Sequence, residues 1–290
     1  MDFKLFFDTD CDITPEFCKK YDAGLISMPY AIDDKEILPY VDFEKFDDKE
    51  FYSTLRKGVL PTTSALNVEE YIRLFKPVLE SGKDILYIHF SRAMSATFNS
   101  CDKAIEELKK QFPKRRIVLI DTKGITLGSY SIDKQLGDLA LAGKSIDEIV
   151  AASKEVIDHT AFYFYADNLK FFARSGRVTG IAALMGGIIG IKPIINIGDD
   201  GKMTSIDKAI GRKKALEKIM EYVNNLQEDI KNYPVIIAHC DCMHLVEELI
   251  ANLKAKYGQD LHVEVEPVNP TAGSHCGPDC IGLTFHAKHR

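Results

Sequence analysis

The sequence has no hydrophobic run long enough to span a membrane, no excess of basic residues and no glycine-rich nucleotide loop. The longest segment without a charged residue, 178–191, is too short to cross a bilayer and is followed by Lys192. The net charge of −6 at pH 7 argues against nucleic acid as a partner, because contact with a phosphate backbone needs a basic face. Neither Gly-x-x-x-x-Gly-Lys nor Gly-x-Gly-x-x-Gly occurs, which argues against nucleotide binding.

The amino-terminal segment does not have the pattern of a secretory signal. Residues 1–10, MDFKLFFDTD, carry acidic residues on both sides of a short apolar run. Hydrophobic residues make up 46% of the chain and charged residues 28%, which is typical of a globular protein. We therefore expect a soluble, cytoplasmic protein with no membrane span, whose contact with membranes is at most transient.

The cysteines do not match a common disulfide, redox or zinc pattern. There are seven of them, an odd number, and Cys-x-x-Cys is absent. Cys276 and Cys280 have a spacing that zinc accepts, but Cys240 and Cys242 are separated by only one residue. We expect no bound metal and no cofactor, and a zinc-binding protein is kept only as the third interpretation.

Strands and helices alternate through the first half of the chain, which is typical of a parallel sheet covered by helices on both faces. The predicted strands there are 4–8, 25–32, 84–90 and 116–121, and the predicted helices are 14–20, 47–57, one that begins after Asn67, 98–112, 126–142 and 145–158.

The second half has a different character, with hairpin-like segments as well as helices. Its predicted elements are strands at 161–167, 235–240, 261–268 and 281–288, a β-hairpin over 193–209 that turns at Asp200-Gly201, and helices at 211–229 and 242–257. We predict an α/β protein of two domains. The first, 1–160, is a parallel α/β/α sandwich, and the second, 161–290, is an α+β domain with a mixed or antiparallel sheet.

Two hydroxyl-rich loops precede predicted helices. One is PTTS, residues 61–64, and the other is the segment 89–98, in which Ser91, Ser95 and Thr97 follow a buried strand. Ligands of parallel α/β sheets bind outside the carboxyl ends of the strands, and helix N-termini favour anions. These loops therefore predict a site for a carboxylate or a phosphate. The turn 174–180, with Arg174 and Arg177, carries charges that suit the same anions.

The strand–turn–helix setting of Ser95 also allows a hydrolase, with His275 as base and Asp8 as its partner. The sequence around Ser95 is Ala-Met-Ser-Ala-Thr and lacks the Gly-x-Ser-x-Gly pattern of a nucleophile elbow. A serine hydrolase acting on an acyl ester is therefore the second interpretation.

Several short motifs, taken in order, resemble the DegV family of fatty-acid-binding proteins, the carrier subunits of bacterial fatty-acid kinases. The resemblance runs from residue 4 to about residue 287, and it departs from the family pattern at Arg92, Ala96 and Cys280. Asp8-Thr9-Asp10-Cys11-Asp12 matches an opening Asp-Ser-x-x-Asp, and His275-Cys276-Gly277-Pro278 matches a C-terminal His-x-Gly-Pro. The other matching segments are 63–66, 91–98, 121–122, 175–178, 191–194 and 212–215.

The resemblance implies a carrier rather than an enzyme. Such a protein binds a long-chain fatty acid and presents its carboxylate to a separate fatty-acid kinase, which converts it to an acyl-phosphate. The family's carboxylate-binding residues correspond to Thr63 and Ser95, with Ser64 and His275 as neighbours. Arg177 and Arg212 are expected to face the kinase or the phosphate. The apolar residues expected along the acyl chain are Phe162, Phe164, Leu184, Met185, Ile188, Ile189 and Ile194.

Overall fold

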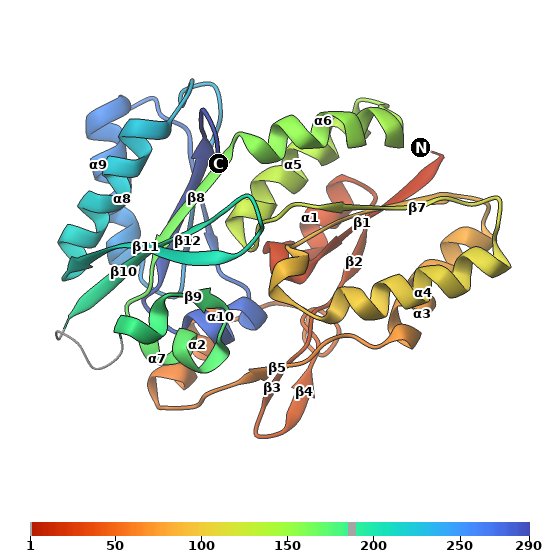
Figure 1. Cartoon of the computed structure of the whole chain (residues 1–290), viewed down its shortest axis with the longest axis horizontal. Coiled ribbons are helices and arrows are strands. Elements are labelled where there is room, and N and C mark those ends of the chain that lie inside the picture. The colour runs from red at the N-terminus through yellow and green to blue at the C-terminus, as the bar shows by residue number, and fades with distance from the viewer. Residues whose placement is uncertain (1, 185–189) are drawn as a thin grey trace.

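The computed structural model of the chain describes residues 2–184 and 190–290. Figure 1 shows two large sheets side by side, each with its own helices, and a small sheet below them. A parallel sheet is built from the first half of the chain and a mixed sheet from the second half, which confirms the predicted fold class. The predicted division at residue 160 puts each large sheet in one part, and it stays a prediction.

Four strands form the parallel sheet, in the order β2-β1-β6-β7: β1 (Phe3–Asp8), β2 (Gly24–Ile26), β6 (Asp84–His89) and β7 (Ile117–Asp121). β1 and β6 are buried along most of their length, as expected for short apolar runs covered on both faces. Asp8, His89 and Asp121 end three neighbouring strands. The polar loops that follow these strands therefore gather at one edge of the sheet.

Five helices surround the parallel sheet: α1 (Pro15–Lys20), α3 (Val68–Glu80), α4 (Thr97–Gln111), α5 (Leu127–Leu141) and α6 (Ile146–Asp158). Side chains cap the starts of α1, α3 and α6, whereas α4 and α5 begin without a side-chain cap hydrogen bond. Asn67 accepts a hydrogen bond from the backbone N–H of Glu70, as the sequence predicts, and Ser145 with Glu148 completes a capping box. Figure 1 places α3 and α4 on one side of the sheet and α5 and α6 on the other.

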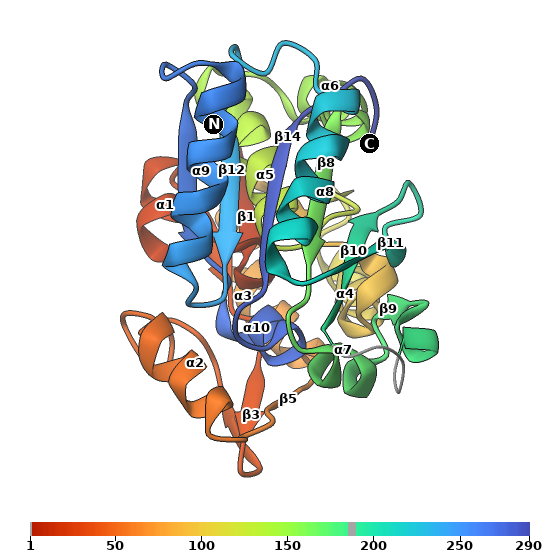
Figure 2. The same ribbon diagram turned by 90° about the vertical axis from the view of Figure 1, so that its left-hand side faces the viewer.

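Seven strands form the mixed sheet, in the order β13-β12-β14-β8-β10-β11-β9. Their bounds are β8 (Thr160–Tyr165), β9 (Val178–Thr179), β10 (Ile191–Ile197), β11 (Met203–Ile210), β12 (Val235–His239), β13 (Val263–Pro267) and β14 (Ile281–His286). α8 (Arg212–Leu226) and α9 (Met243–Tyr257) cover its outer face (Figure 2). β10 and β11 form the predicted antiparallel hairpin, and the N–H of Gly201 donates to the carbonyl of Gly198 in its turn.

The alternation of side chains along β8 divides the mixed sheet between two hydrophobic cores. Tyr163 and Tyr165 pack with α8 and α9 in the outer core. Phe162 and Phe164 point the other way and join the large core shared with the parallel sheet. This two-residue period gives the sheet one face toward its own helices and one face toward the first half of the chain.

The predicted strand 25–32 is wrong, because the structure divides it between two sheets. β2 ends at Ile26, and β3 (Tyr30–Ile32) belongs to a small antiparallel sheet with β4 (Lys35–Ile37) and β5 (Thr62–Thr63). Pro29 lies between the two strands, and proline cannot donate a ladder hydrogen bond. The predicted loop 59–66 contains β5, and α2 (Asp48–Arg56) lies next to this sheet in Figure 2.

Two short helices are not predicted from the sequence. α7 (Leu169–Ser175) ends inside the predicted arginine turn, and α10 (Pro270–Cys276) precedes the last strand. Three single turns of 3-10 helix complete the described chain: η1 (Thr9–Cys11), η2 (Arg92–Met94) and η3 (Ile181–Leu184). These elements are shorter than the window over which hydrophobic periodicity can be recognised.

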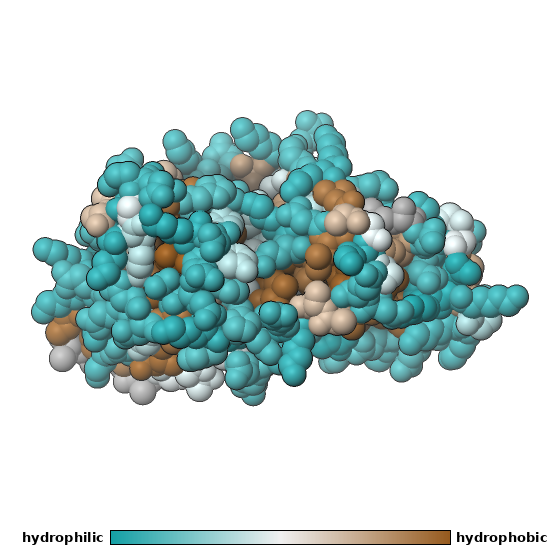
Figure 3. Space-filling view, turned by 90° about the horizontal axis from the view of Figure 1, so that it is seen from above, coloured by the Kyte–Doolittle hydropathy of each residue, from teal (hydrophilic) through white to brown (hydrophobic). Residues whose placement is uncertain are grey.

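The surface is polar over most of the face shown in Figure 3, where hydrophobic residues gather in a few limited areas. Within residues 2–184 and 190–290, no helix combines the length and the apolar character needed to cross a membrane.

Candidate functional site

A cavity lies where the carboxyl ends of the parallel strands meet the inner face of the mixed sheet. The space between its walls, open mouth included, is about 810 Å³. Its polar lining residues are Asp10, Thr63, Ser64, Ser95, Thr126, Arg177, Thr271 and His275. Its apolar lining residues include Met28, Phe90, Met94, Leu127, Phe162, Phe164, Phe172, Met203, Ala238 and Val268.

One hydroxyl loop precedes α3 and the other precedes α4, and both reach the cavity. Thr63 belongs to β5 and pairs with Tyr30, while Arg174 donates hydrogen bonds to the carbonyls of Leu60 and Pro61 and so holds the loop in place. Ser95 follows η2, and its Oγ accepts a hydrogen bond from the N–H of Thr97, 3.2 Å away. The hydroxyl proton of Ser95 is therefore free to point toward a ligand.

His275 comes from the far end of the chain and meets Thr63, with 2.9 Å between Nε2 and Oγ1. Its helix, α10, is tied to the first half of the chain by Asn269, whose backbone and side-chain N–H groups each donate to Oδ1 of Asp12 at 2.8 Å. Burial and the charge of Arg177 lower the pKa of His275 to about 4. The imidazole is therefore neutral at pH 7 and able to exchange a hydrogen bond with Thr63.

Ser64 is the fourth predicted head-group residue, and it also lines the cavity. Its hydroxyl donates to the carboxylate of Glu36 at 2.7 Å. That bond occupies its single proton, so Ser64 is less suited to donate to a ligand than Thr63 or Ser95.

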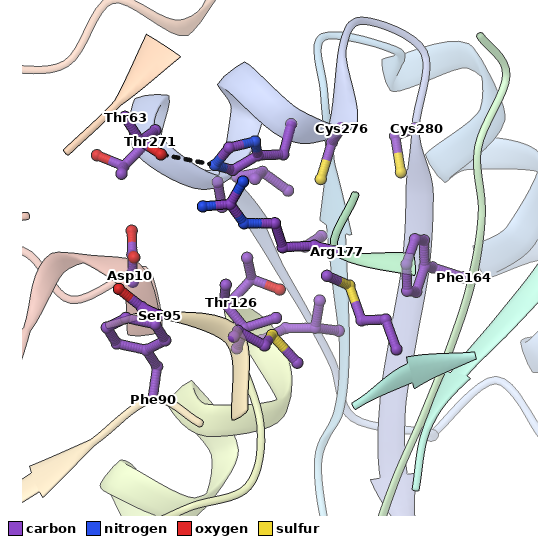
Figure 4. Close-up of a pocket in the computed structure, with 18 of the residues that line it drawn as sticks. Asp10, Thr63, Phe90, Ser95, Thr126, Phe164, Arg177, Thr271, Cys276 and Cys280 are labelled. Carbon is purple, nitrogen blue, oxygen red and sulfur yellow. Dashed lines mark hydrogen bonds between the residues drawn. The ribbon is translucent and has the colours of Figure 1, made fainter. Parts of the chain in front are cut away.

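Arg177 and Arg212, predicted together, lie in different surroundings. Arg177 follows the left-handed Gly176 that ends α7, and Figure 4 shows its guanidinium reaching into the cavity toward Thr63. Arg212 does not line the cavity. Its guanidinium is paired with Asp167 at 2.9 Å and with Asp279 at 3.1 Å. Of the two arginines, only Arg177 offers its charge to a molecule inside the cavity.

Asp10 is a polar lining residue to which the sequence analysis gives no role. It is 7% exposed, and among the described residues its Oδ1 has no hydrogen-bond partner. Burial, and then the nearby Asp8 and Asp12, raise the pKa of Asp10 well above its usual range. A protonated carboxyl is a hydrogen-bond donor. The spacing of Asp8, Asp10 and Asp12 at the end of β1 is the signal that could have identified it.

The predicted acyl-chain residues divide into three groups. Phe162 and Phe164 line the cavity, and their contact with an acyl chain stays a prediction. Leu184 is half-buried and Ile194 is fully buried, but neither lines it. Ile194 pairs with Tyr165 across β10 and β8, so it packs in the outer core on the opposite face of the sheet. The remaining three, Met185, Ile188 and Ile189, lie outside the described residues.

Ser95, His275 and Asp8, the three residues predicted for a hydrolase, are not linked to one another by hydrogen bonds in the part of the chain that the structure describes. His275 bonds Thr63 rather than Ser95. Asp8 accepts hydrogen bonds from the hydroxyl of Tyr87 and from the backbone N–H of Phe90, far along the chain from His275. The arrangement offers hydrogen-bond donors to a bound anion, and it does not form a nucleophile–base–acid chain.

Comparisons with known proteins agree along nearly the whole chain. A family model described as "Uncharacterised protein, DegV family" matches residues 2–288. A DegV domain-containing protein of Clostridium perfringens is 31% identical over 283 residues, which cover 98% of this chain and 97% of that protein.

Two solved structures have the same fold. One is a DegV family protein from Thermus thermophilus described as fatty-acid-binding, with a TM-score of 0.85 and 23% identity over 99% of this chain and 100% of that one. The other is a stearic-acid-binding protein from Eubacterium ventriosum, with a TM-score of 0.86 and 20% identity over 99% of this chain and 98% of that one. The resemblance inferred from the motifs is confirmed, and the chain belongs to the DegV family.

Proposed function

We propose that the cavity binds one long-chain fatty acid, with the carboxylate beside Thr63, Ser95, Arg177 and His275. The observation that carries this proposal is the uneven distribution of polarity in the cavity. Figure 4 shows the hydroxyls of Thr63 and Ser95 on one side and Phe164 on the other. An amphipathic ligand with one charged end fits such walls.

The polar end matches a carboxylate in charge and in hydrogen bonding. Arg177 brings a positive charge, and Thr63 and Ser95 bring hydroxyl donors. The raised pKa of Asp10 favours the protonated carboxyl, which would add a further donor without adding a negative charge. The apolar end would gain about 0.8 kcal/mol for each methylene group that it buries. The fatty acids named for the two structural relatives support the same class of ligand.

We further propose that the protein is a carrier, which works in the cytoplasm and presents the bound carboxylate to a separate kinase. The absence of nucleotide-binding motifs from the sequence favours a partner that supplies ATP. Arg177 is exposed as well as lining the cavity, so it is suited to meet the phosphate that the kinase adds. Arg212, whose charge is already paired with Asp167 and Asp279, is a weaker candidate.

The test begins with the ligand itself. Protein made in bacteria is denatured and extracted, and the lipids are identified by mass spectrometry. The expected result is one long-chain fatty acid per chain. Delipidated protein is then titrated with fatty acids of increasing length, and the affinity should rise with each methylene. If no fatty acid is extracted and none binds after delipidation, the proposal is wrong. Acyl-phosphate formation with ATP and a fatty-acid kinase tests the carrier role separately.

A further inference from the structure

Three cysteines that lie far apart in the sequence converge in the wall of the cavity. Cys240 follows β12, Cys276 ends α10, and Cys280 comes directly before β14. Their sulfur atoms all lie within 4.8 Å of one another. Cys276 and Cys280 line the cavity, on the opposite side from Thr63 in Figure 4. The three thiols are called the thiol cluster below.

The backbone holds two members of the thiol cluster in register. The N–H of Cys240 donates to the carbonyl of Cys280 at 2.9 Å, and the N–H of Asp279 donates back to the carbonyl of Cys240 at 2.8 Å. The guanidinium of Arg56 contacts the carboxylates of both Asp241 and Asp279. The two cysteine loops are therefore fixed to each other before any ligand binds.

The third member is placed by the end of α10. The N–H of Gly277 donates to the carbonyl of Gly273 at 2.8 Å, and Gly277 adopts a φ of +70° that ends the helix at Cys276. A side chain at Gly277 would meet the ring of Phe171 at 2.3 Å, so this tight turn requires glycine. The turn directs Cys276 toward the loops of Cys240 and Cys280.

The chemistry of the thiol cluster selects a thiophilic cation. All three of its candidate ligand atoms are sulfur, which favours Zn²⁺ or Cu⁺ over Mg²⁺ or Ca²⁺. Cys240 and Cys280 are buried, and buried thiolates need a compensating positive charge. Zn²⁺ offsets two of the three thiolate charges and Cu⁺ only one, so the burial favours zinc. The cavity beside Cys276 and Cys280 gives an ion a path of entry.

We propose that Cys240, Cys276 and Cys280 form a binding site for a single Zn²⁺ ion, separate from the fatty-acid carboxylate site. Three protein ligands leave a fourth coordination position for water or another small ligand. The expectation of no metal rested on pairs of neighbouring cysteines. The structure pairs Cys240 with Cys280 across two strands instead, and it leaves Cys242 outside the cluster, with its sulfur against the carbonyl of Cys280 at 3.5 Å.

The test titrates the reduced, metal-free full chain with Co²⁺ and then with Zn²⁺ under anaerobic conditions. One Co²⁺ per chain should bind with strong sulfur-to-metal charge-transfer absorption, and one Zn²⁺ should displace it with release of protons. Cys276→Ser and Cys280→Ser should weaken Zn²⁺ binding by more than about 100-fold, beyond the loss that changes to outer partners cause. Cys101→Ser, a buried cysteine of α4 outside the cluster, is the matched control and should bind as the wild type does.

Three results would overturn the site. The first is the failure of the wild type to bind one Zn²⁺. The second is equal affinity in the wild type and Cys276→Ser. The third is an anaerobically purified, unreduced protein that shows fewer than seven free thiols in denaturant with a chelator, with the missing pair in the thiol cluster, because that pair would then be a disulfide. The Co²⁺ spectrum of the wild type counts thiolate ligands even if a variant fails to fold. Fatty-acid binding is measured on the same samples, so the two proposals can fail independently.

Discussion

The parallel sheet and the mixed sheet contribute to the cavity in different ways. The parallel sheet meets it with strand ends, so its contribution comes from loops such as those that carry Asp10 and Ser95. The mixed sheet meets it with a face, so its contribution comes from alternate residues within strands, such as Phe162 and Phe164. The strand ends of the parallel sheet supply hydrogen-bonding groups such as those of Asp10 and Ser95, whereas the face of the mixed sheet supplies apolar area.

Because of this difference, we expect substitutions in the two regions to change different quantities, ligand affinity in one and the free energy of unfolding in the other. A loop residue such as Ser95 is half-buried and its hydroxyl accepts one hydrogen bond, from the N–H of Thr97, so it can change at little cost to the fold. A residue of the sheet face packs against the large core while its neighbours pack in the outer core. Changes on the parallel-sheet side should therefore act mainly on ligand affinity, and changes on the mixed-sheet side mainly on the free energy of unfolding.

The largest effect is expected for Phe164→Ala on the sheet face. Removing this 4%-exposed ring should lower the free energy of unfolding by about 3–5 kcal/mol, measured by urea denaturation. Phe164→Leu keeps most of the volume and is the matched control, with a cost of less than about 1.5 kcal/mol. A loss below 1 kcal/mol in Phe164→Ala would contradict the separation between the two sides of the cavity.

A smaller effect, on affinity rather than stability, is expected for Thr63→Ala and for Ser95→Ala. Each loses a hydrogen bond to the charged head group, which should weaken fatty-acid binding by about 1.5–3 kcal/mol in an equilibrium titration. The free energy of unfolding should fall by only about 1 kcal/mol in Thr63→Ala, which loses its bond to His275.

The control for these loop variants is Ser81→Ala, whose hydroxyl bonds the carbonyl of Val78 away from the cavity. It should leave affinity unchanged. If the double variant Thr63→Ala/Ser95→Ala binds as tightly as the wild type, neither residue holds the carboxylate.

Gly282→Ala should destabilise the sheet face by about 1–3 kcal/mol, because the new Cβ would lie 2.4 Å from Cβ of Phe164. Gly128→Ala is the comparison. Its Cβ would meet Phe162 at an ordinary 3.6 Å within α5, and a helical alanine should raise stability by about 0.5–1 kcal/mol. The unfolding temperatures of the two variants should move in opposite directions. Equal shifts would show that the close approach of β14 and β8 is not required for stability.

The last prediction concerns pH and a buried carboxyl beneath the strand ends. Burial raises the pKa of Asp133 well above its usual range, and neither of its carboxyl oxygens has a hydrogen-bond partner among the described residues. In the unfolded chain, the carboxyl of Asp133 ionises with a pKa of about 3.9. In the native protein, the same carboxyl stays protonated to a higher pH. Asp133 therefore contributes stability below that pH, and this contribution is lost as pH rises toward its raised native pKa.

Asp133→Asn removes this titration. Its stability relative to the wild type should increase by about 1.4 kcal/mol per pH unit between the two pKa values and then level off. Histidines titrate alike in both proteins, so the difference isolates Asp133. A flat curve for Asp133→Asn would show that Asp133 is ionised in the native protein.

Much of the fold could be predicted because its signals are local. Alternating buried strands and capped helices predict the parallel sheet, and Asp200-Gly201 predicts the hairpin of β10 and β11. The break at Pro29 and the helices α7 and α10 were not predicted, because each depends on a few residues whose neighbours come from elsewhere in the chain. The face on which Ile194 lies depends on its pairing with Tyr165, which the sequence of β10 alone does not specify.

The candidate site shows the same limit. Thr63, Ser95 and His275 could be identified by residue type and by their matches to the family motifs, and the structure brings all three to one cavity, although their role stays a prediction. The spacing of the acids after β1 could have drawn attention to Asp10, but not its role as a donor, because a carboxyl at a strand end becomes a donor only when burial and nearby acids raise its pKa.

The sequence by itself determined the family, most of the strands and helices with their order, and the hydroxyl loops, because these depend on residue type and spacing along one segment. Only the tertiary structure decided which arginine reaches the cavity and which is held by Asp167 and Asp279. It also decided that Cys240 joins Cys276 and Cys280, while its near neighbour Cys242 does not. The reason is geometric: strand pairing and sheet packing bring together side chains whose separation along the chain carries no information about their distance in space.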